Sequence, residues 1–276
     1  MHSARLATQA AIVLLLVFVS LVAPDVLAAP AGTPFGYGVV FDNDSMTYNF
    51  VSLPDATTIA PLDVQLLAAT FIGDDYTTEY AIDVDANLVT VDTATGDTTL
   101  IGSLGVAAQP RVSLGADPQS GALYGILGDN NCFATLLYSI DRTTAAATLI
   151  APLPECVASI AYDPAGLLYL LDVGADALNV VDTLGNETTL GPLGILMNPS
   201  ARVVVDPVSG ALYLIEFDLP SFTNLIFAVD TATGAATLVG PLGGENPIGA
   251  PLLAPAPAGP PDMIFADGFD PPARVH

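Results

Sequence analysis

The residues that most often carry catalytic chemistry are scarce in this chain. Histidine occurs only as His2 and His276, near the two ends, and lysine does not occur. The folded part therefore offers no imidazole as a general base, metal ligand or triad member, and no lysine for Schiff-base chemistry. Carboxylates are the chemistry that remains, since 29 Asp and Glu residues stand against five basic ones.

Most of the acids occupy positions that predict turns. Glycoside cleavage needs only two carboxylates about 5–10 Å apart, and so many acids could supply such a pair. Seven of them, however, recur at two fixed places in the sequence repeats: Asp92, Asp141, Asp182, Asp230, Asp117, Asp163 and Asp206. An Asp in a turn accepts a hydrogen bond from a backbone N–H two residues on. We interpret these seven as structural.

Three acidic clusters have the composition of a calcium site, because calcium binds several carboxylate and carbonyl oxygens. They lie at residues 42–44, 74–75 and 83–87. The third begins like an EF-hand loop, but Leu88 stands where the loop needs Gly and Ala94 where it needs Glu. An EF-hand is therefore rejected. We expect no cofactor, with a weaker calcium loop as the alternative.

The elements that must position these residues are tandem β repeats. Strand, Asp-Pro turn and strand recur at 111–124, 159–169 and 202–213, and a hairpin recurs at 91–100, 140–149, 181–190 and 229–238. The aligned Tyr80, Tyr124, Tyr169 and Tyr213 are 44, 45 and 44 residues apart. Four short strands with tight turns fill that length, which is one propeller blade. The sequence predicts an all-β fold, a β-propeller of about five four-stranded blades, with six as the alternative.

The first repeat is incomplete. Residues 37–62 contain the hairpin half but no recognisable innermost strand, and residues 249–253 have the length of a strand without a blade of their own. We predict that the C-terminal strand completes the first blade, so that the N- and C-terminal strands close the ring and leave no exposed edge.

Both ends of the chain differ from the repeats in composition. Arg5, an apolar run over 11–23 and the ending Val26-Leu27-Ala28 predict a signal peptide at 1–28. The apolar run has 13 residues, fewer than the roughly 18 to 20 that cross a bilayer. We expect a secreted protein without membrane insertion after cleavage, an uncleaved anchor being the alternative. The propeller then occupies 29–253, and 254–276 form a Pro-rich linker and a C-terminal tail.

Two cysteines and two arginines stand out within the predicted blades. Cys132 and Cys156 are the two cysteines, and an exported chain with an even number normally pairs them. In a four-stranded blade, the loop between strands two and three emerges on the same face as the connection to the next blade. The two cysteines occupy those two loops, so we predict a disulfide. No base is available to activate a catalytic thiol.

Arg111 and Arg202 begin the innermost strands of the predicted third and fifth blades. Both should lie near the central channel, on the face that carries the cysteine loops. One interpretation is that they neutralise neighbouring carboxylates. The other is that they bind an anionic group of a ligand.

The string from Thr70 to Asp83, TFIGDDYTTEYAID, and the Val-Asp-Thr-Ala-Thr-Gly hairpins resemble secreted bacterial β-propeller domains of unknown function. The resemblance covers roughly residues 36–253. It implies a fold and supplies no catalytic signature. The terminal Ile264-Phe-Ala-Asp-Gly-Phe-Asp270 is similar to a tail on otherwise unrelated exported proteins of some Gram-negative bacteria.

Several propeller activities fit poorly. Tryptophan is absent, although quinone-cofactor and sialidase-type propellers usually carry aromatic residues of this kind in each blade, and propeller lactonases typically need a histidine. The formal net charge of −24 would repel nucleic acid and anionic membranes. We expect a secreted, monomeric, non-catalytic propeller that binds an unknown protein or glycan, or acts as a scaffold. The alternative is a carboxylate-dependent glycosidase or lyase. A deep pocket with two non-turn carboxylates would favour the enzyme, and a channel plugged by Val, Leu and Ala would favour the scaffold.

Overall fold

A computed structural model describes residues 34–107, 111–128, 134–153, 156–244 and 246–256. The predicted signal peptide and most of the Pro-rich tail lie outside these residues. Within them every regular element is a β-strand, and no helix is present that could span a membrane.

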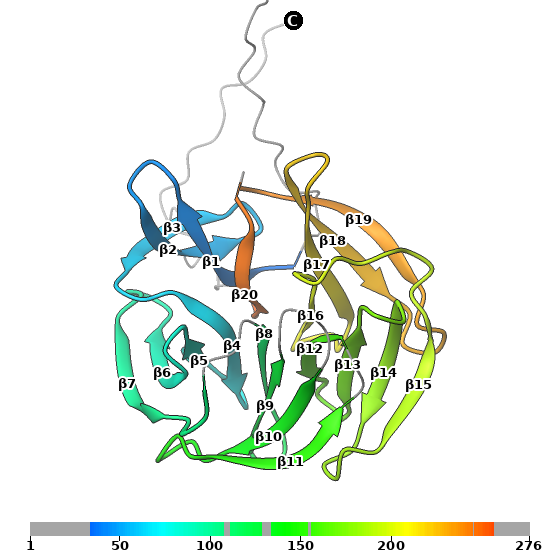
Figure 1. Ribbon diagram of the computed structural model, residues 1–276. Coiled ribbons are helices and arrows are strands. Elements are labelled where there is room, and N and C mark those ends of the chain that lie inside the picture. The colour runs from blue at the N-terminus through cyan, green and yellow to red at the C-terminus, as the bar shows by residue number, and fades with distance from the viewer. Residues whose placement is uncertain (1–33, 108–110, 129–133, 154–155, 245, 257–276) are drawn as a thin grey trace, which may run out of the picture.

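The strands form five four-stranded antiparallel sheets, which are the five blades of a β-propeller (Figure 1). The predicted fold is confirmed, with five blades rather than six. From the channel outward, blade 1 consists of β20 (Ile248–Leu253), β1 (Gly36–Asp42), β2 (Thr47–Leu53) and β3 (Thr57–Leu62). Blade 2 consists of β4 (Leu66–Ile72), β5 (Asp75–Asp83), β6 (Asn87–Asp92) and β7 (Thr98–Ser103).

The other three blades follow the chain order. Blade 3 consists of β8 (Arg111–Ala116), β9 (Leu123–Gly128), β10 (Thr135–Ile140) and β11 (Ala147–Leu153). Blade 4 consists of β12 (Val157–Tyr162), β13 (Leu168–Asp172), β14 (Ala177–Val181) and β15 (Glu187–Pro192). Blade 5 consists of β16 (Arg202–Val205), β17 (Leu212–Asp218), β18 (Thr223–Val229) and β19 (Ala236–Leu242).

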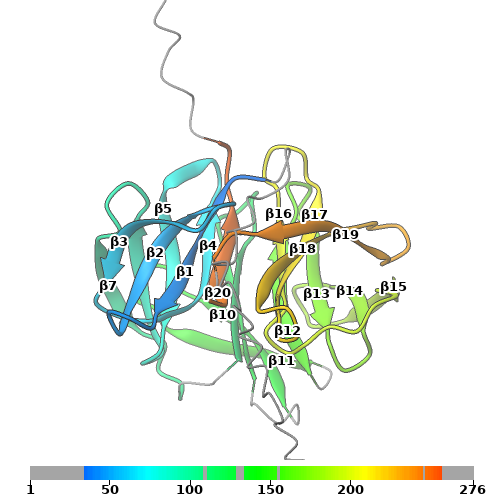
Figure 2. The same cartoon turned by 90° about the horizontal axis from the view of Figure 1, so that it is seen from above.

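The C-terminal strand closes the ring, as the sequence predicts. β20 pairs with β1 in antiparallel register, with Tyr37 opposite Leu252, and Figures 1 and 2 show the two strands side by side. The crossing from β19 into β20 is held by Asn224, which is almost fully buried. Its Nδ2 donates to the carbonyl of Asn246 at 2.9 Å, and its Oδ1 accepts from the N–H of Ile248 at 3.0 Å.

The repeated aspartates shape the turns between strands. Asp92 accepts hydrogen bonds from the backbone N–H groups of Ala94 and Thr95 at 2.9 and 3.0 Å. The same pattern, an Asp side chain accepting from an N–H two residues on, recurs at Asp117, Asp141, Asp182, Asp206 and Asp230. Asp163 accepts instead from Leu167, four residues on. The structural interpretation of all seven is confirmed.

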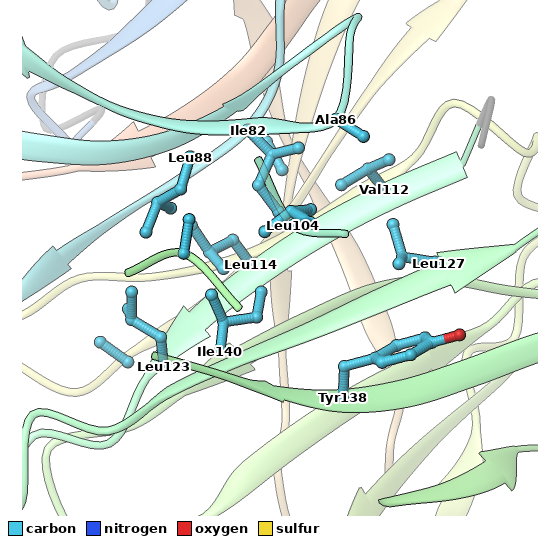
Figure 3. Packing of buried hydrophobic residues seen from close by; sticks show 13 residues of the cluster. Ile82, Ala86, Leu88, Leu104, Val112, Leu114, Leu123, Leu127, Tyr138 and Ile140 are labelled. Atoms are coloured by element: carbon cyan, nitrogen blue, oxygen red, sulfur yellow. The ribbon is translucent and has the colours of Figure 1, made fainter. Parts of the chain in front are cut away.

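Hydrophobic side chains pack between neighbouring blades rather than in one central core. Between blades 2 and 3, Leu88 and Leu104 contact the cluster that contains Leu114 and Ile140 (Figure 3). Each blade is covered on both faces by its neighbouring blades, which explains why apolar residues fill both faces of its strands. The blades pack against each other through these faces, and their inner strands surround a central channel.

Candidate functional site in the central channel

The inner strands β4, β8, β12, β16 and β20 surround the channel (Figure 1). Each is the edge strand of its sheet, so its unpaired backbone N–H and C=O groups face the channel and need partners there. Serine side chains supply two of these partners. Ser113 Oγ accepts from the N–H of Ile160 at 3.0 Å, and Ser159 Oγ accepts from the N–H of Val203 at 3.1 Å. Neighbouring blades are thereby joined at the channel wall.

A cavity of about 200 Å³ lies in the channel and is lined by residues of all five inner strands. The residues that line it run from Arg202, Ser113 and Ser159 at its inner end to the turns that follow the inner strands. Those turns carry Asp163, Pro118, Pro164 and Pro207. The cavity therefore lies on the side of the Asp-Pro turns, and the channel is not plugged throughout by Val, Leu and Ala.

Arg202 stands where blades 2, 3 and 4 carry a small residue. Strand register places Ala68 opposite Ile82, Ser113 opposite Ile126, Ser159 opposite Leu171 and Arg202 opposite Ile215. Each of these positions is four residues before the Asp that starts the turn in blades 3, 4 and 5. The fold itself accepts Ala or Ser at this position, so the arginine is an addition specific to blade 5.

The guanidinium of Arg202 has few partners. Its Nη1 donates to the carbonyl of Ala201 at 3.0 Å and more weakly to that of Pro199 at 3.5 Å. Among the residues that the structure describes, no carboxylate forms an ion pair with Arg202. Burial, and then the nearby charge of Arg111, lower the pKa of Arg202 to about 10, so it stays a cation at neutral pH.

Arg111 is the first residue of β8 and is 4% exposed. Its Nη1 donates to Cys156 Sγ at 3.4 Å. Arg111 and Arg202 therefore begin two inner strands, as predicted, and lie close enough for their charges to interact. Arg202 lines the cavity, and Arg111 does not. For Arg202, the missing carboxylate favours the ligand-binding interpretation over simple charge neutralisation; for both residues the binding role stays a prediction.

Aromatic and acidic side chains surround the outer end of the cavity. Phe71 and Tyr76 from blade 2 form an edge-to-face pair with ring centroids 5.3 Å apart, and Tyr162 lines the cavity from blade 4. Burial raises the pKa of the Tyr76 hydroxyl, and the nearby Asp74 and Asp206 raise it further. The cavity thus has a cation at its inner end and carboxylates near its outer end.

The carboxylates of the cavity do not form the pair that an enzyme of the predicted kind needs. Asp74 and Asp163 line the cavity. Asp163 is committed to its turn, since it accepts from the N–H of Leu167 at 2.8 Å. Asp74, in the turn between β4 and β5, is the lining carboxylate that accepts no hydrogen bond from a described residue. The sequence foresaw either a deep pocket with two such carboxylates or a plugged channel. The structure shows an open cavity with one such carboxylate.

The acidic clusters considered for calcium are engaged in local hydrogen bonds. Asp42 accepts from the N–H of Asp44 at 2.9 Å, and Asp83 accepts from the N–H groups of Asp85 and Asn87 at 2.9 Å. Within the described ranges, no three His, Cys, Asp or Glu side chains gather as a metal would require. Calcium binding stays an untested alternative.

The predicted disulfide falls partly outside the described residues. Cys156 lies just before β12, whereas Cys132 belongs to the segment 129–133 between β9 and β10, which is outside them. The pairing of the two cysteines stays a prediction.

Sequence reasoning did not identify the two channel serines, the aromatic residues at the cavity mouth or the buried Glu79. The serines carried a signal, because alignment on the Asp-Pro turns places Ser113, Ser159 and Arg202 at one position. Glu79 carried none. It lies in a polar stretch of β5, yet it is 2% exposed, its Oε1 has no hydrogen-bond partner among the described residues, and burial raises its pKa to about 8.

Comparison with known proteins supports the fold and no more. No family model matches the chain, and no curated protein matches it. Among solved structures it is similar to a chain of a nidogen/laminin complex, with 12% identity, TM-score 0.51, and coverage of 81% of this chain and 98% of that one. A Bacteroides thetaiotaomicron protein of unknown function matches with 16% identity, TM-score 0.51, and coverage of 75% and 58%.

A third similar structure is hydrazine synthase of Kuenenia stuttgartiensis, with 16% identity, TM-score 0.42, and coverage of 63% of this chain and 49% of that one. The chain therefore spans about half of that matched chain, 49%, and somewhat more of the Bacteroides protein, 58%. At these identities the likeness concerns the β-propeller fold alone.

Proposed function

We propose that this protein is a secreted, non-catalytic binding module that takes a small ligand into its central channel from the face of the Asp-Pro turns. The observation that carries the proposal is the cavity of about 200 Å³ between the inner strands. Concave sites with apolar and aromatic walls and a few polar groups are the usual form of ligand pockets. Secretion rests on the predicted signal peptide.

The lining supports binding rather than catalysis. Phe71, Tyr76 and Tyr162 provide flat apolar surfaces, and the serines and Arg202 provide fixed polar groups at the inner end. A scaffold without a ligand would gain more stability from a channel filled by larger apolar side chains, since an unfilled cavity costs packing energy. The carboxylate-dependent enzyme remains the alternative, and a second carboxylate beside Asp74 that is not engaged in shaping a turn would be the observation to favour it.

The test is a thermal-shift screen of the mature chain against neutral and acidic sugars, amino acids and short peptides. A ligand at 100 times its Kd should stabilise the fold by about 2.7 kcal/mol. Tyr76→Ala should reduce the shift, because Tyr76 lines the cavity. Phe222→Ala is the matched control, since Phe222 is 68% exposed in the turn between β17 and β18. A shift that Tyr76→Ala leaves unchanged would refute a channel site.

A further inference from the structure

Arg202 is a cation that the fold does not require. The corresponding positions of three other inner strands are Ala68, Ser113 and Ser159, so an arginine is not needed to build or close the ring. Arg202 is half-buried, and shielding a guanidinium from water without a counter-charge costs stability. Nη1 bonds to backbone carbonyls, but Nε and Nη2 have no acceptor among the described residues, and neither atom is sealed from solvent. Two donors are therefore available at the inner end of the cavity.

The two ends of the cavity carry opposite charge. Asp74 and Asp163 lie at the outer end, and Asp206 lies near Tyr76 on the same side. Three residue steps along β16 lead from Arg202 to Val205, so the span between the ends is about 10 Å at roughly 3.3 Å per residue. A carboxylate matches the guanidinium, because the planar fork of arginine can bind both of its oxygens. Hydroxyl or amino groups match the aspartates, which only accept hydrogen bonds when ionised.

The net charge of the protein disfavours the binding of a small inorganic anion. Its formal net charge of −24 repels anions in solution, although physiological salt screens this over about 8 Å. A ligand with donors at its outer end offsets that repulsion at the acidic mouth. Inorganic phosphate, by contrast, is too small to contact Arg202 and the aspartates at the outer end at the same time, so the repulsion would not be offset.

Resting on the proposed channel function, we propose that the ligand is a small organic carboxylate with hydroxyl or amino donors at its opposite end. Arg202 binds the carboxylate, Asp74 accepts from the donors, and Tyr76 and Tyr162 contact the body of the molecule. Two sources share this chemistry, an acidic sugar and a short peptide.

Isothermal titration of the mature chain distinguishes the sources with matched pairs of probes. D-glucuronate is compared with D-glucose, and alanyl-alanine with alanyl-alanine amide; inorganic phosphate is the bare anion. At least one carboxylate should bind about tenfold or more tightly than its partner without the carboxylate, as expected for a charge-assisted bond, and added salt should weaken it. Phosphate should not bind measurably.

The variants assign the preference to one residue. Arg202→Gln should abolish the preference for the carboxylate, and Arg202→Lys should keep part of it. Arg142→Gln removes the same charge at an exposed turn outside the cavity and should leave the preference unchanged. If Arg202→Gln fails to fold, the comparison of each carboxylate with its partner on the natural protein still measures what the ligand's carboxylate contributes to binding.

The inference is wrong if the partners without a carboxylate bind as well as the carboxylates, if Arg202→Gln keeps the preference, or if neither carboxylate binds. Neutral binding that Tyr76→Ala abolishes would leave the channel function intact and remove only the anionic ligand class. Binding that neither Tyr76→Ala nor Arg202→Gln affects would contradict the channel site as well.

Discussion

At the scale of the residue, one aligned position of the inner strands has a structural role in blades 3 and 4 and forms part of the candidate site in blade 5. Ser113 and Ser159 each satisfy an N–H group at the edge of the next inner strand, whereas Arg202, with donors only, cannot accept such a bond. Blade 5 therefore exchanges a structural acceptor for a cation. Such a substitution costs stability, because a half-buried guanidinium loses part of its hydration.

Glu79 is the second residue whose environment conflicts with its charge. It is almost fully buried in β5, and burial raises the pKa of its carboxyl to about 8, while an unfolded Glu titrates near 4.3. The folded state therefore holds a proton that the unfolded state releases. Its contribution to stability is fully present below the unfolded pKa and is lost as pH rises through about 8.

We predict that the free energy of unfolding falls between pH 4.5 and 8 by up to about 1.4 kcal/mol per pH unit from Glu79. Glu79→Gln should remove this slope, as measured by urea unfolding at several pH values. Glu187→Gln is the matched control: the pKa of Glu187 is raised too, but its side chain is partly exposed and bonded to Asn179, so its effect should be smaller. Equal slopes in Glu79→Gln and the natural protein would contradict the assignment.

At the scale of the element, the repeat period was the strongest signal in the sequence. Alignment of the tyrosines gave the blade length, and the unpaired segment 249–253 gave the closing strand, which the structure places as β20 beside β1. Both succeeded because each blade repeats the same turn chemistry, which local sequence determines. The burial of Glu79 could not be read in this way, since it depends on how a neighbouring blade covers β5.

The candidate site was predicted only in outline. The sequence placed Arg111 and Arg202 at the starts of inner strands, but it could not show that Arg202 lines a cavity while Arg111 does not. That distinction depends on how far each side chain reaches between blades, and on which channel volume the small residues Ala68, Ser113 and Ser159 leave open. The aromatic mouth depends on the turn between β4 and β5, whose path no repeat motif specifies.

The predicted disulfide between Cys132 and Cys156 belongs to this scale, because it would join two loops on one face. Closing a loop of about 25 residues should stabilise the fold by roughly 3 kcal/mol in the chain-entropy model. Reduction should therefore lower the Tm by roughly 6–12 °C. The double variant Cys132→Ser, Cys156→Ser should melt at the lower temperature with or without reductant. Two free thiols in the unreduced, denatured protein would contradict the pairing.

At the scale of the whole molecule, the propeller separates stability from binding. Apolar side chains pack between blades, where Phe50, Ile126, Leu170 and Leu214 are almost fully buried, and the ring is closed by β20. Several residues that line the channel, among them Leu114, Ile160 and Val204, also belong to these clusters, so it is the polar lining residues that can change without loss of this packing. That division explains why a chain with few catalytic residue types still holds a cavity with charges fixed at both ends.

The most direct test of the account is a crystallographic soak of the mature protein with a library of small neutral and acidic molecules. The account predicts that bound molecules gather in the channel cavity, between the inner strands and beneath Tyr76 and Tyr162, with any carboxylate turned toward Arg202. Bound molecules found instead on the outer strands or on the face of the cysteine loops, with the cavity holding only water, would contradict it.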